Sequence, residues 1–356
     1  MTAAVDVAQY GTTSPSWRNR IINGAMTIDQ RNAGAAVTAL DAYAVDRWQY
    51  EGSQTLKSTL QQNAGAVTSP AGFTNYYGAT SSSAYSVGAS DFFFIGQRIE
   101  GFNVADLGWG TANAATVTLS FLVRSSLTGT FGGALANGAA NRSYPFSYSI
   151  SSANTWEQKS ITIVGDTSGT WITNNGLGIR LRFSLGAGAT FSGTAGAWAA
   201  GNLASATGAT SVVGTNGATF YVTGVQLERG SVATPFDYRS YGQELALCQR
   251  YAVAYGGATV FESFGYGFAI STSAVQTILA LPVPLRTTPS LTVSGSIVIA
   301  DGVNSFTIFV LSIPENQQGL QQVTVNSTSS GLTQFRPYRI QANNNTTSRL
   351  IFTAEL

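Results

Sequence analysis

The residues of this chain with the clearest binding chemistry are aromatic side chains in loop-like segments. A pyranose ring presents an apolar C–H face that stacks on an aromatic ring, while nearby polar groups bind its hydroxyls. Glycines flank one tryptophan in Leu107–Gly110, and another lies in a Gly/Ala/Ser/Thr-rich loop over residues 186–217. The predicted sugar contacts on exposed loops are Trp109, Trp198, Trp171, Tyr76 and Tyr77.

Packing inside the protein is the alternative role for each of these rings. For Trp48 and Trp156 we expect packing at the edge of a β-sandwich or at a subunit interface. For Trp109 and Trp198 the sequence leaves ligand contact and internal packing equally open.

The carboxylates form no local pair of the kind that glycoside cleavage uses, in which two Asp or Glu groups flank a groove. Asp46 precedes Arg47 and Glu228 precedes Arg229, so we expect structural ion pairs at strand ends. The chain is therefore not expected to be an enzyme. The acids considered are scattered: Asp46, Asp91, Glu100, Asp106, Asp166, Glu228 and Asp237.

The chain contains no histidine and one cysteine, Cys248. This excludes Ser-His-Asp and Cys-His arrangements, makes a transition-metal site improbable, and leaves the cysteine as a small buried hydrophobe. A structural Ca²⁺ near Asp29, Asp46 and Glu228 is the one cofactor considered, although these residues lack the spacing of a calcium loop.

Composition indicates a β-rich, oligomeric protein with few charges. Only 10% of the residues are charged, against roughly 25% in typical soluble domains, and the net charge is +1. No run of Lys or Arg marks a nucleic-acid partner, and no apolar stretch reaches the roughly 20 residues of a membrane helix. The N-terminus also lacks the basic-then-apolar pattern of a secretory signal.

Alternating apolar residues predict strands through most of the chain. In 116–124, Val117, Leu119, Phe121 and Val123 share one face. Eight or more such strands around one core indicate a jelly roll. The other clear examples are residues 143–150, 157–164, 177–185 and 218–227.

The fold class predicted is all-β: a jelly-roll β-sandwich followed by a short helix and a second small β-sandwich. Helical spacing of Leu245, Cys248 and Tyr251 marks the helix. The predicted divisions are an extended arm over 1–18, the jelly roll over 19–240, a helical hinge over 241–251 and a β-sandwich over 252–356. Strands expected in the last division are 253–255, 266–270, 275–281, 290–299, 304–311, 322–326, 338–341 and 348–353.

Two sequence strings carry a resemblance to a known class of proteins. One runs from Thr223 to Tyr251 and includes Gly-Val-Gln-Leu-Glu, Pro-Phe-Asp-Tyr-Arg and Cys-Gln-Arg-Tyr; the other comprises Asn19–Arg31 and Tyr43–Trp48. Together they resemble strings in tail-fibre and tail-associated virion proteins of bacteriophages. The segment between them resembles carbohydrate-binding modules of jelly-roll type, with tryptophan-bearing turns at Asn154–Trp156 and Gly165–Trp171.

The resemblance implies a bacteriophage virion protein, assembled in the host cytoplasm and freed by lysis. Its favoured function is that of a tail fibre that binds a host surface polysaccharide during adsorption. The alternative is an adaptor or decoration protein of the tail or capsid. Related fibres are trimeric, so a homotrimer is expected, with the N-terminal arm docked on another virion protein.

Overall fold

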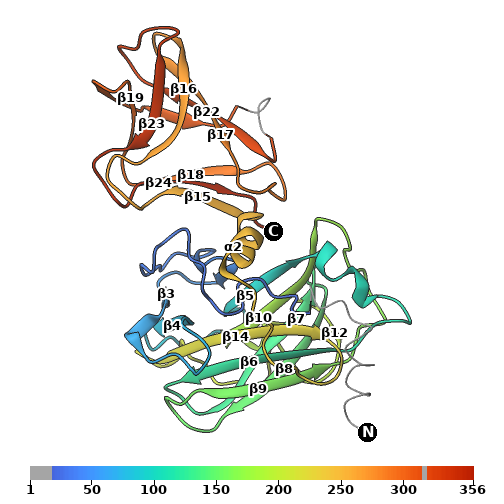
Figure 1. Cartoon of the computed structure of the whole chain (residues 1–356). Coiled ribbons are helices and arrows are strands. Elements are labelled where there is room, and N and C mark those ends of the chain that lie inside the picture. The colour runs from blue at the N-terminus through green and yellow to red at the C-terminus, as the bar shows by residue number, and fades with distance from the viewer. Residues whose placement is uncertain (1–17, 315–318) are drawn as a thin grey trace. The chain divides into compact units, whose positions relative to one another are not determined.

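The chain forms two compact β units, residues 18–241 and residues 242–355 (Figure 1). A computed structural model describes residues 18–314 and 319–356. The docking arm predicted for residues 1–18 therefore lies outside the described residues, except for Arg18. Within the described residues, no helix is both long enough and apolar enough to cross a membrane.

The first unit consists of two antiparallel sheets and one small parallel pair. The parallel pair joins β11 (Ser192–Gly193) to β13 (Ser205–Ala206). The larger sheet has the order β1 (Tyr43–Val45), β2 (Trp48–Gly52), β5 (Phe92–Glu100), β10 (Leu177–Ala187), β7 (Gly129–Asn137), β8 (Arg142–Ile150), β12 (Ala199–Ala200). The second sheet has the order β3 (Ser58–Gln62), β4 (Tyr77–Ser81), β14 (Thr219–Arg229), β6 (Val117–Ser125), β9 (Glu157–Ile163).

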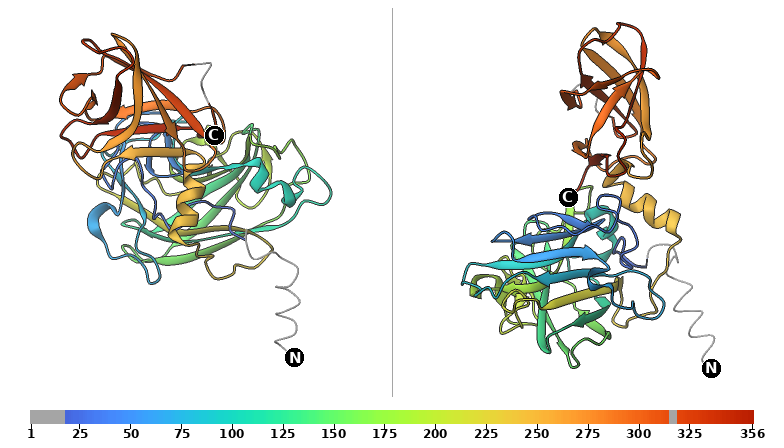
Figure 2. Two further views of the ribbon diagram at one scale, coloured as in Figure 1. Left: turned by 45° about the horizontal axis from the view of Figure 1, so that its top comes forward. Right: turned by 90° about the vertical axis from the view of Figure 1, so that its left-hand side faces the viewer.

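The core of the first unit lies between these two sheets, whose long strands run side by side in Figure 2. Phe93 and Phe183 of the larger sheet and Phe121 and Phe220 of the second sheet are each at most 1% exposed. Because strands from distant parts of the chain contribute to each sheet, the unit is the jelly-roll sandwich that the sequence predicts.

The alternating pattern that predicts strands is confirmed in β6, where Val117, Leu119, Phe121 and Val123 are all buried. The expectation of one long loop over residues 186–217 is wrong. This segment contains β11, β12 and β13, and β12 adds to the larger sheet by pairing with β8. Backbone groups of this segment form hydrogen bonds with the rest of the sandwich, so the segment is not a free loop.

The N-terminal string, Asn19–Arg31, lies against β14, the strand in which the second string begins. The amide of Val225 donates to Gly24 O at 3.0 Å, and the amide of Arg20 donates to Leu227 O at 2.8 Å. Asn19 donates through Nδ2 to Val225 O at 3.1 Å, and its Oδ1 accepts from Leu227 N at 3.1 Å. The start of the described chain therefore runs along β14, some 206 residues away in sequence.

The second unit is a small sandwich that follows helix α2 (Tyr241–Gln249). Cys248 on this helix is buried, as the sequence predicts. The smaller sheet has the order β15 (Ala252–Gly256), β24 (Arg349–Thr353), β18 (Ser290–Ser294). The larger sheet has the order β20 (Ser305–Thr307), β19 (Ile297–Ala300), β23 (Pro337–Ala342), β16 (Ser263–Ser271), β17 (Ala274–Ala280), β22 (Gln322–Thr328), β21 (Val310–Ser312).

One core joins the two sheets of this second sandwich, with Val253 and Phe352 from the smaller sheet and Leu279 and Ile340 from the larger. Two strand predictions need correction. The segment 290–299 is two strands, β18 and β19, because Gly295 has φ +67° and turns the chain between them. The segment 304–311 is likewise divided between β20 and β21.

Candidate functional site

Three tryptophans that are far apart in sequence meet in the first unit. The ring centroid of Trp109 lies 4.7 Å from that of Trp171 and 5.4 Å from that of Trp198. The centroids of Trp171 and Trp198 are also 5.4 Å apart, and all three pairs are edge to face. We call Trp109, Trp171 and Trp198 the tryptophan cluster; it unites three of the five predicted sugar contacts.

Backbone carbonyls fix the orientation of each ring in the tryptophan cluster. Trp109 Nε1 donates to Ala115 O at 2.7 Å, and Trp198 Nε1 donates to Val164 O at 2.7 Å. Trp171 Nε1 donates to Ser168 O at 3.0 Å, within its own turn. The polar edge of each indole is therefore occupied by the protein, and a ligand could meet only the carbon faces of the rings.

The three rings differ in exposure, and this corrects the expectation for Trp109. Its flanking glycines do not expose the ring, which is only 7% exposed. Gly110 has φ +83°, and a Cβ there would lie 2.8 Å from Gly169 O, so the glycine allows two loops to approach closely. Trp171 and Trp198 are half-buried and form the rim of the cluster, with Trp109 as their buried support.

An ion pair beside the tryptophan cluster holds one of its loops in place. Arg142 of β8 donates to the carboxylate of Asp166 through Nε at 2.8 Å and through Nη2 at 2.7 Å. The carboxylate also accepts from Ser168 N at 3.1 Å, and Gly110 N donates to the backbone oxygen of Asp166 at 2.7 Å. The hydrogen bond from Asp166 raises the pKa of the Arg142 guanidinium above its ordinary value.

Arg142 was not predicted from the sequence, because its position in a strand gave no sign of its partner. Asp166 appeared only among the scattered acids. The available signal was the turn Gly165–Trp171, which places a carboxylate five residues before a tryptophan. The side chain of Arg142 is 23% exposed and that of Asp166 is 3% exposed, so the arginine is the polar group more open to a ligand.

The prediction that Tyr76 and Tyr77 lie exposed on a loop is wrong, because both are fully buried. The Tyr76 hydroxyl donates to Ala64 O at 2.8 Å and accepts from Val67 N at 2.9 Å, so the 64–67 segment covers the ring. Tyr77 begins β4 and points into the sandwich core, where burial raises the pKa of its hydroxyl. Neither side chain can contact a ligand in this structure.

The two tryptophans expected to pack against protein do so. Trp48 is fully buried, and its Nε1 donates to Asn23 O at 3.0 Å. Trp156 is half-buried against Tyr76, with a centroid separation of 5.6 Å, and its Nε1 donates to Thr68 O at 2.9 Å. Trp156 thus resembles the rim tryptophans in exposure and bonding but lies outside the tryptophan cluster.

Asp46 and Glu228, the two carboxylates for which the sequence predicts structural ion pairs, both contact basic side chains of the protein. Asp46 is 1% exposed and pairs with Arg31 Nη1 at 3.0 Å. Glu228 accepts from Thr234 Oγ1 at 2.6 Å and from Gln226 Nε2 at 2.9 Å. Arg18 Nε approaches Glu228 to 4.0 Å.

Each carboxylate considered for Ca²⁺ binding has hydrogen-bond or ion-pair partners within the protein. Asp29 accepts from Gly34 N at 2.7 Å and from Asn32 N at 2.9 Å, while burial raises the pKa of its carboxyl. Asp46 and Glu228 make the contacts described above. Among residues 18–314 and 319–356, no group of three or more His, Cys, Asp or Glu could hold a metal ion.

No protein-family model and no curated protein matches this chain. Solved structures to which this chain is similar include a putative sugar binding protein from Bacteroides thetaiotaomicron, with 13% identity and a TM-score of 0.35, covering 60% of this chain and 100% of that one. A family 4 carbohydrate-binding module has 12% identity and a TM-score of 0.31, with 58% and 98% covered. The enzymatically active domain of tailspike protein 4 from bacteriophage CBA120 has 11% identity and a TM-score of 0.33. That match covers 61% of this chain but only 22% of the tailspike chain. These TM-scores are too low for the likeness to carry any function to this chain.

Proposed function

We propose that this chain is a bacteriophage virion protein that binds a glycan of the host surface through the rim of the tryptophan cluster. The observation that carries the proposal is the arrangement of Trp171 and Trp198, which are half-buried, around the buried ring of Trp109. Rings fixed in this way lose little conformational freedom on binding, and their open carbon faces suit the C–H faces of sugars.

Polar chemistry next to the rings supports the same proposal. Arg142 lies beside the cluster with 23% of its side chain exposed, and the ion pair with Asp166 holds it in one orientation. A site that combines apolar rings with a few fixed polar groups is typical of small-ligand recognition. The proposal assigns binding to this chain and no catalytic step.

The virion part of the proposal rests on the two strings that resemble phage tail proteins. The start of the first string, Asn19–Gly24, packs along the part of the second string that lies in β14, so these parts form one structural feature. We include in the proposal a tail-fibre role, a homotrimer, and assembly in the host cytoplasm before lysis. Light scattering of the purified protein measures the subunit number directly, and a stable monomer would contradict the trimer.

The function is tested by binding of the purified protein to a panel of bacterial strains and to their isolated surface polysaccharides. Saturable binding to some strains only, with no release of reducing ends, is the expected result. Trp171→Ala and Trp198→Ala should each weaken binding by about tenfold or more. Trp156→Ala is the matched control, because it removes another half-buried tryptophan that lies outside the cluster, and it should leave binding unchanged.

Failure of a folded protein to bind any strain would contradict the receptor-binding function. It would assign the chain to an adaptor or decoration role in the tail or capsid. Equal weakening by Trp156→Ala would show that the loss comes from general destabilisation and would remove the cluster as the contact site.

A further inference from the structure

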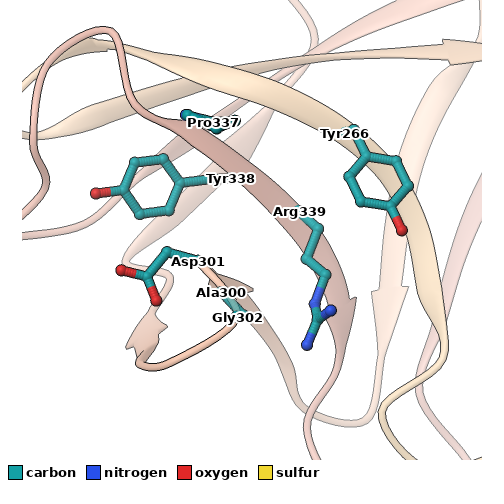
Figure 3. Close-up of a pocket in the computed structure, with 7 residues that line it drawn as sticks. All are labelled: Tyr266, Ala300, Asp301, Gly302, Pro337, Tyr338 and Arg339. Atoms are coloured by element: carbon teal, nitrogen blue, oxygen red, sulfur yellow. The ribbon is translucent and has the colours of Figure 1, made fainter.

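The larger sheet of the second unit carries a pocket that the function proposed above does not use. It has a volume of about 220 Å³ and lies between the ring of Tyr266, the side chain of Arg339 and the 300–302 turn (Figure 3). Pro337 closes another side. We call this the Tyr266–Arg339 pocket.

Strand register places its main groups in one row across the sheet. Tyr266 of β16 is directly opposite Arg339 of β23, and Arg339 is directly opposite Ala300 of β19. Residues opposite each other in an antiparallel pair share a face of the sheet. The small side chain of Ala300 beside the long one of Arg339 leaves the hollow, and Phe268 opposite Pro337 extends the same face by one row.

The aromatic groups of this face are open. Tyr266 is 70% exposed and Phe268 is 48% exposed, unusual values for two neighbouring rings on one strand. In Figure 3 the Tyr266 ring and the Arg339 side chain extend on the same side of β23, whereas Tyr338 and Asp301 extend away from them. The two exposed rings can therefore form an apolar floor for a flat ligand.

Arg339 provides a positive charge that the described protein does not neutralise. Its Nε donates to Gln341 Oε1, and its two terminal amino groups have no hydrogen-bond or ion-pair partner among residues 18–314 and 319–356. None of the strands β16 to β24 contains an acidic residue. A guanidinium with two free amino groups binds carboxylates through paired hydrogen bonds.

Asp301 also lines the pocket, and its carboxylate already has partners within the protein. Its Oδ1 accepts from Asn304 N at 2.7 Å and from Val303 N at 2.9 Å, while Oδ2 lies 3.1 Å from Arg336 Nη2. The Asp301 side chain is only 1% exposed, so it shapes the 300–302 turn and does not compete for Arg339.

We infer that the Tyr266–Arg339 pocket binds a carboxylate-bearing sugar, such as a uronic acid unit of an anionic polysaccharide. Tyr266 and Phe268 stack on the sugar ring, and Arg339 binds its carboxylate. This inference stands independently of the tryptophan cluster, because it uses other residues in the other unit.

The test measures binding of the full chain to oligogalacturonate, to the same oligomer with its carboxylates methyl-esterified, to a glucuronate-containing polymer and to polysialic acid. Binding of at least one acidic probe, with weakening at higher salt and loss on esterification where tested, is the expected result. Arg339→Gln and Tyr266→Ala should each lower the affinity by at least about tenfold. Arg349→Gln on the smaller sheet and Phe309→Ala, which removes a ring that is 65% exposed outside the pocket, are the controls and should change nothing.

Four outcomes would overturn the inference. The first is absence of binding to every acidic probe, and the second is equal binding to the acidic and esterified oligomers. The third is self-association that is lost in Tyr266→Ala with no selection for acidic sugars, which would make this face a contact between copies of the chain. Loss of acidic-sugar binding in Trp171→Ala but not in Arg339→Gln would also overturn it, while leaving the proposed function intact.

Discussion

Arg142 donates two hydrogen bonds to the carboxylate of Asp166, at 2.8 Å from Nε and 2.7 Å from Nη2. The pair joins strand β8 to the turn that carries Trp171, and Asp166 also accepts from Ser168 within that turn. Because two parallel bonds fix both distance and angle, the ion pair determines where the half-buried ring of Trp171 stands.

Replacing Arg142 with methionine should destabilise the first unit by about 2 kcal/mol, because the nearly buried carboxylate of Asp166 loses its charged partner. Thermal or urea unfolding measures this change. Lys159→Met is the control, since the carboxylate that it leaves unpaired, Glu157, is 16% exposed against 3% for Asp166, and it should cost less than about 1 kcal/mol. Equal losses of stability in the two variants would show that the Arg142–Asp166 pair stabilises the protein no more than the Lys159–Glu157 pair does.

Trp109→Ala should destabilise the protein by about 3–5 kcal/mol, as expected for loss of a buried tryptophan. Trp198→Ala should cost clearly less, because that ring is half-buried. Urea unfolding of the two variants gives the comparison. If Trp109→Ala were the milder change, the assignment of Trp109 as the support of the cluster would be wrong.

Tyr148→Phe should stabilise the protein by about 1 kcal/mol, because the Tyr148 hydroxyl is buried without a hydrogen-bond partner among the described residues. The ring itself stays packed against Phe121, with centroids 5.0 Å apart. Tyr76→Phe is the matched control: its hydroxyl both donates and accepts, so its loss should destabilise. A fall in Tm for Tyr148→Phe would refute the prediction.

The carboxylate of Asp91 should make stability depend on acidic pH. Hydrogen bonds from Tyr85, then Ser53 and Gly88, hold the pKa of Asp91 below its ordinary value. The folded state thus favours the ionised form, and this contribution is present above the ordinary pKa and disappears as the pH falls through the lowered one. The difference in Tm between the natural protein and Asp91→Asn should be present at pH 7 and shrink below about pH 4. A difference that is constant across this range would contradict the prediction.

Gly24→Ala should destabilise the first unit by about 3 kcal/mol or more, because a Cβ there would lie 2.2 Å from Val225 O. The neighbouring atom belongs to backbone and cannot move aside cheaply. Gly242→Ala is the control, since a Cβ at that position in α2 meets nothing within 4 Å and alanine favours a helix. Similar Tm values for Gly24→Ala and the natural protein would show that the contact with β14 is loose.

The strands that the sequence predicted correctly are those in which apolar residues alternate with polar ones, such as β6 and β9. The central strand β5 was not predicted, because its Phe-Phe-Phe-Ile run is buried on both sides and shows no alternation. Strand β7 was missed for the opposite reason: Gly132 and Gly133 have little intrinsic preference for a strand. Neighbouring strands, and not local preference, determine both elements.

The candidate site was predictable only as separate residues. Trp109, Trp171 and Trp198 come from three loops, and periodicity within a loop says nothing about which other loop lies beside it. The prediction that Tyr76 and Tyr77 are exposed was wrong because these residues follow Asn75 in a turn-like segment. In the structure, the 64–67 segment covers Tyr76. Such coverage depends on contacts between segments and leaves no local pattern.

The pairing of Asn19 and Gly24 with Val225 and Leu227 has a consequence during synthesis. Ribosomes add roughly 5–20 residues each second, so Asn19 leaves the ribosome about 10–40 s before its partner 206 residues later. Until then β14 is absent, the second sheet has a gap between β4 and β6, and the apolar faces of both remain open to water. An mRNA that is truncated before the codon for Val225 therefore encodes most of the strands of the first unit, but its product cannot close the sandwich. Such fragments are not working half-domains, and the cell must degrade them.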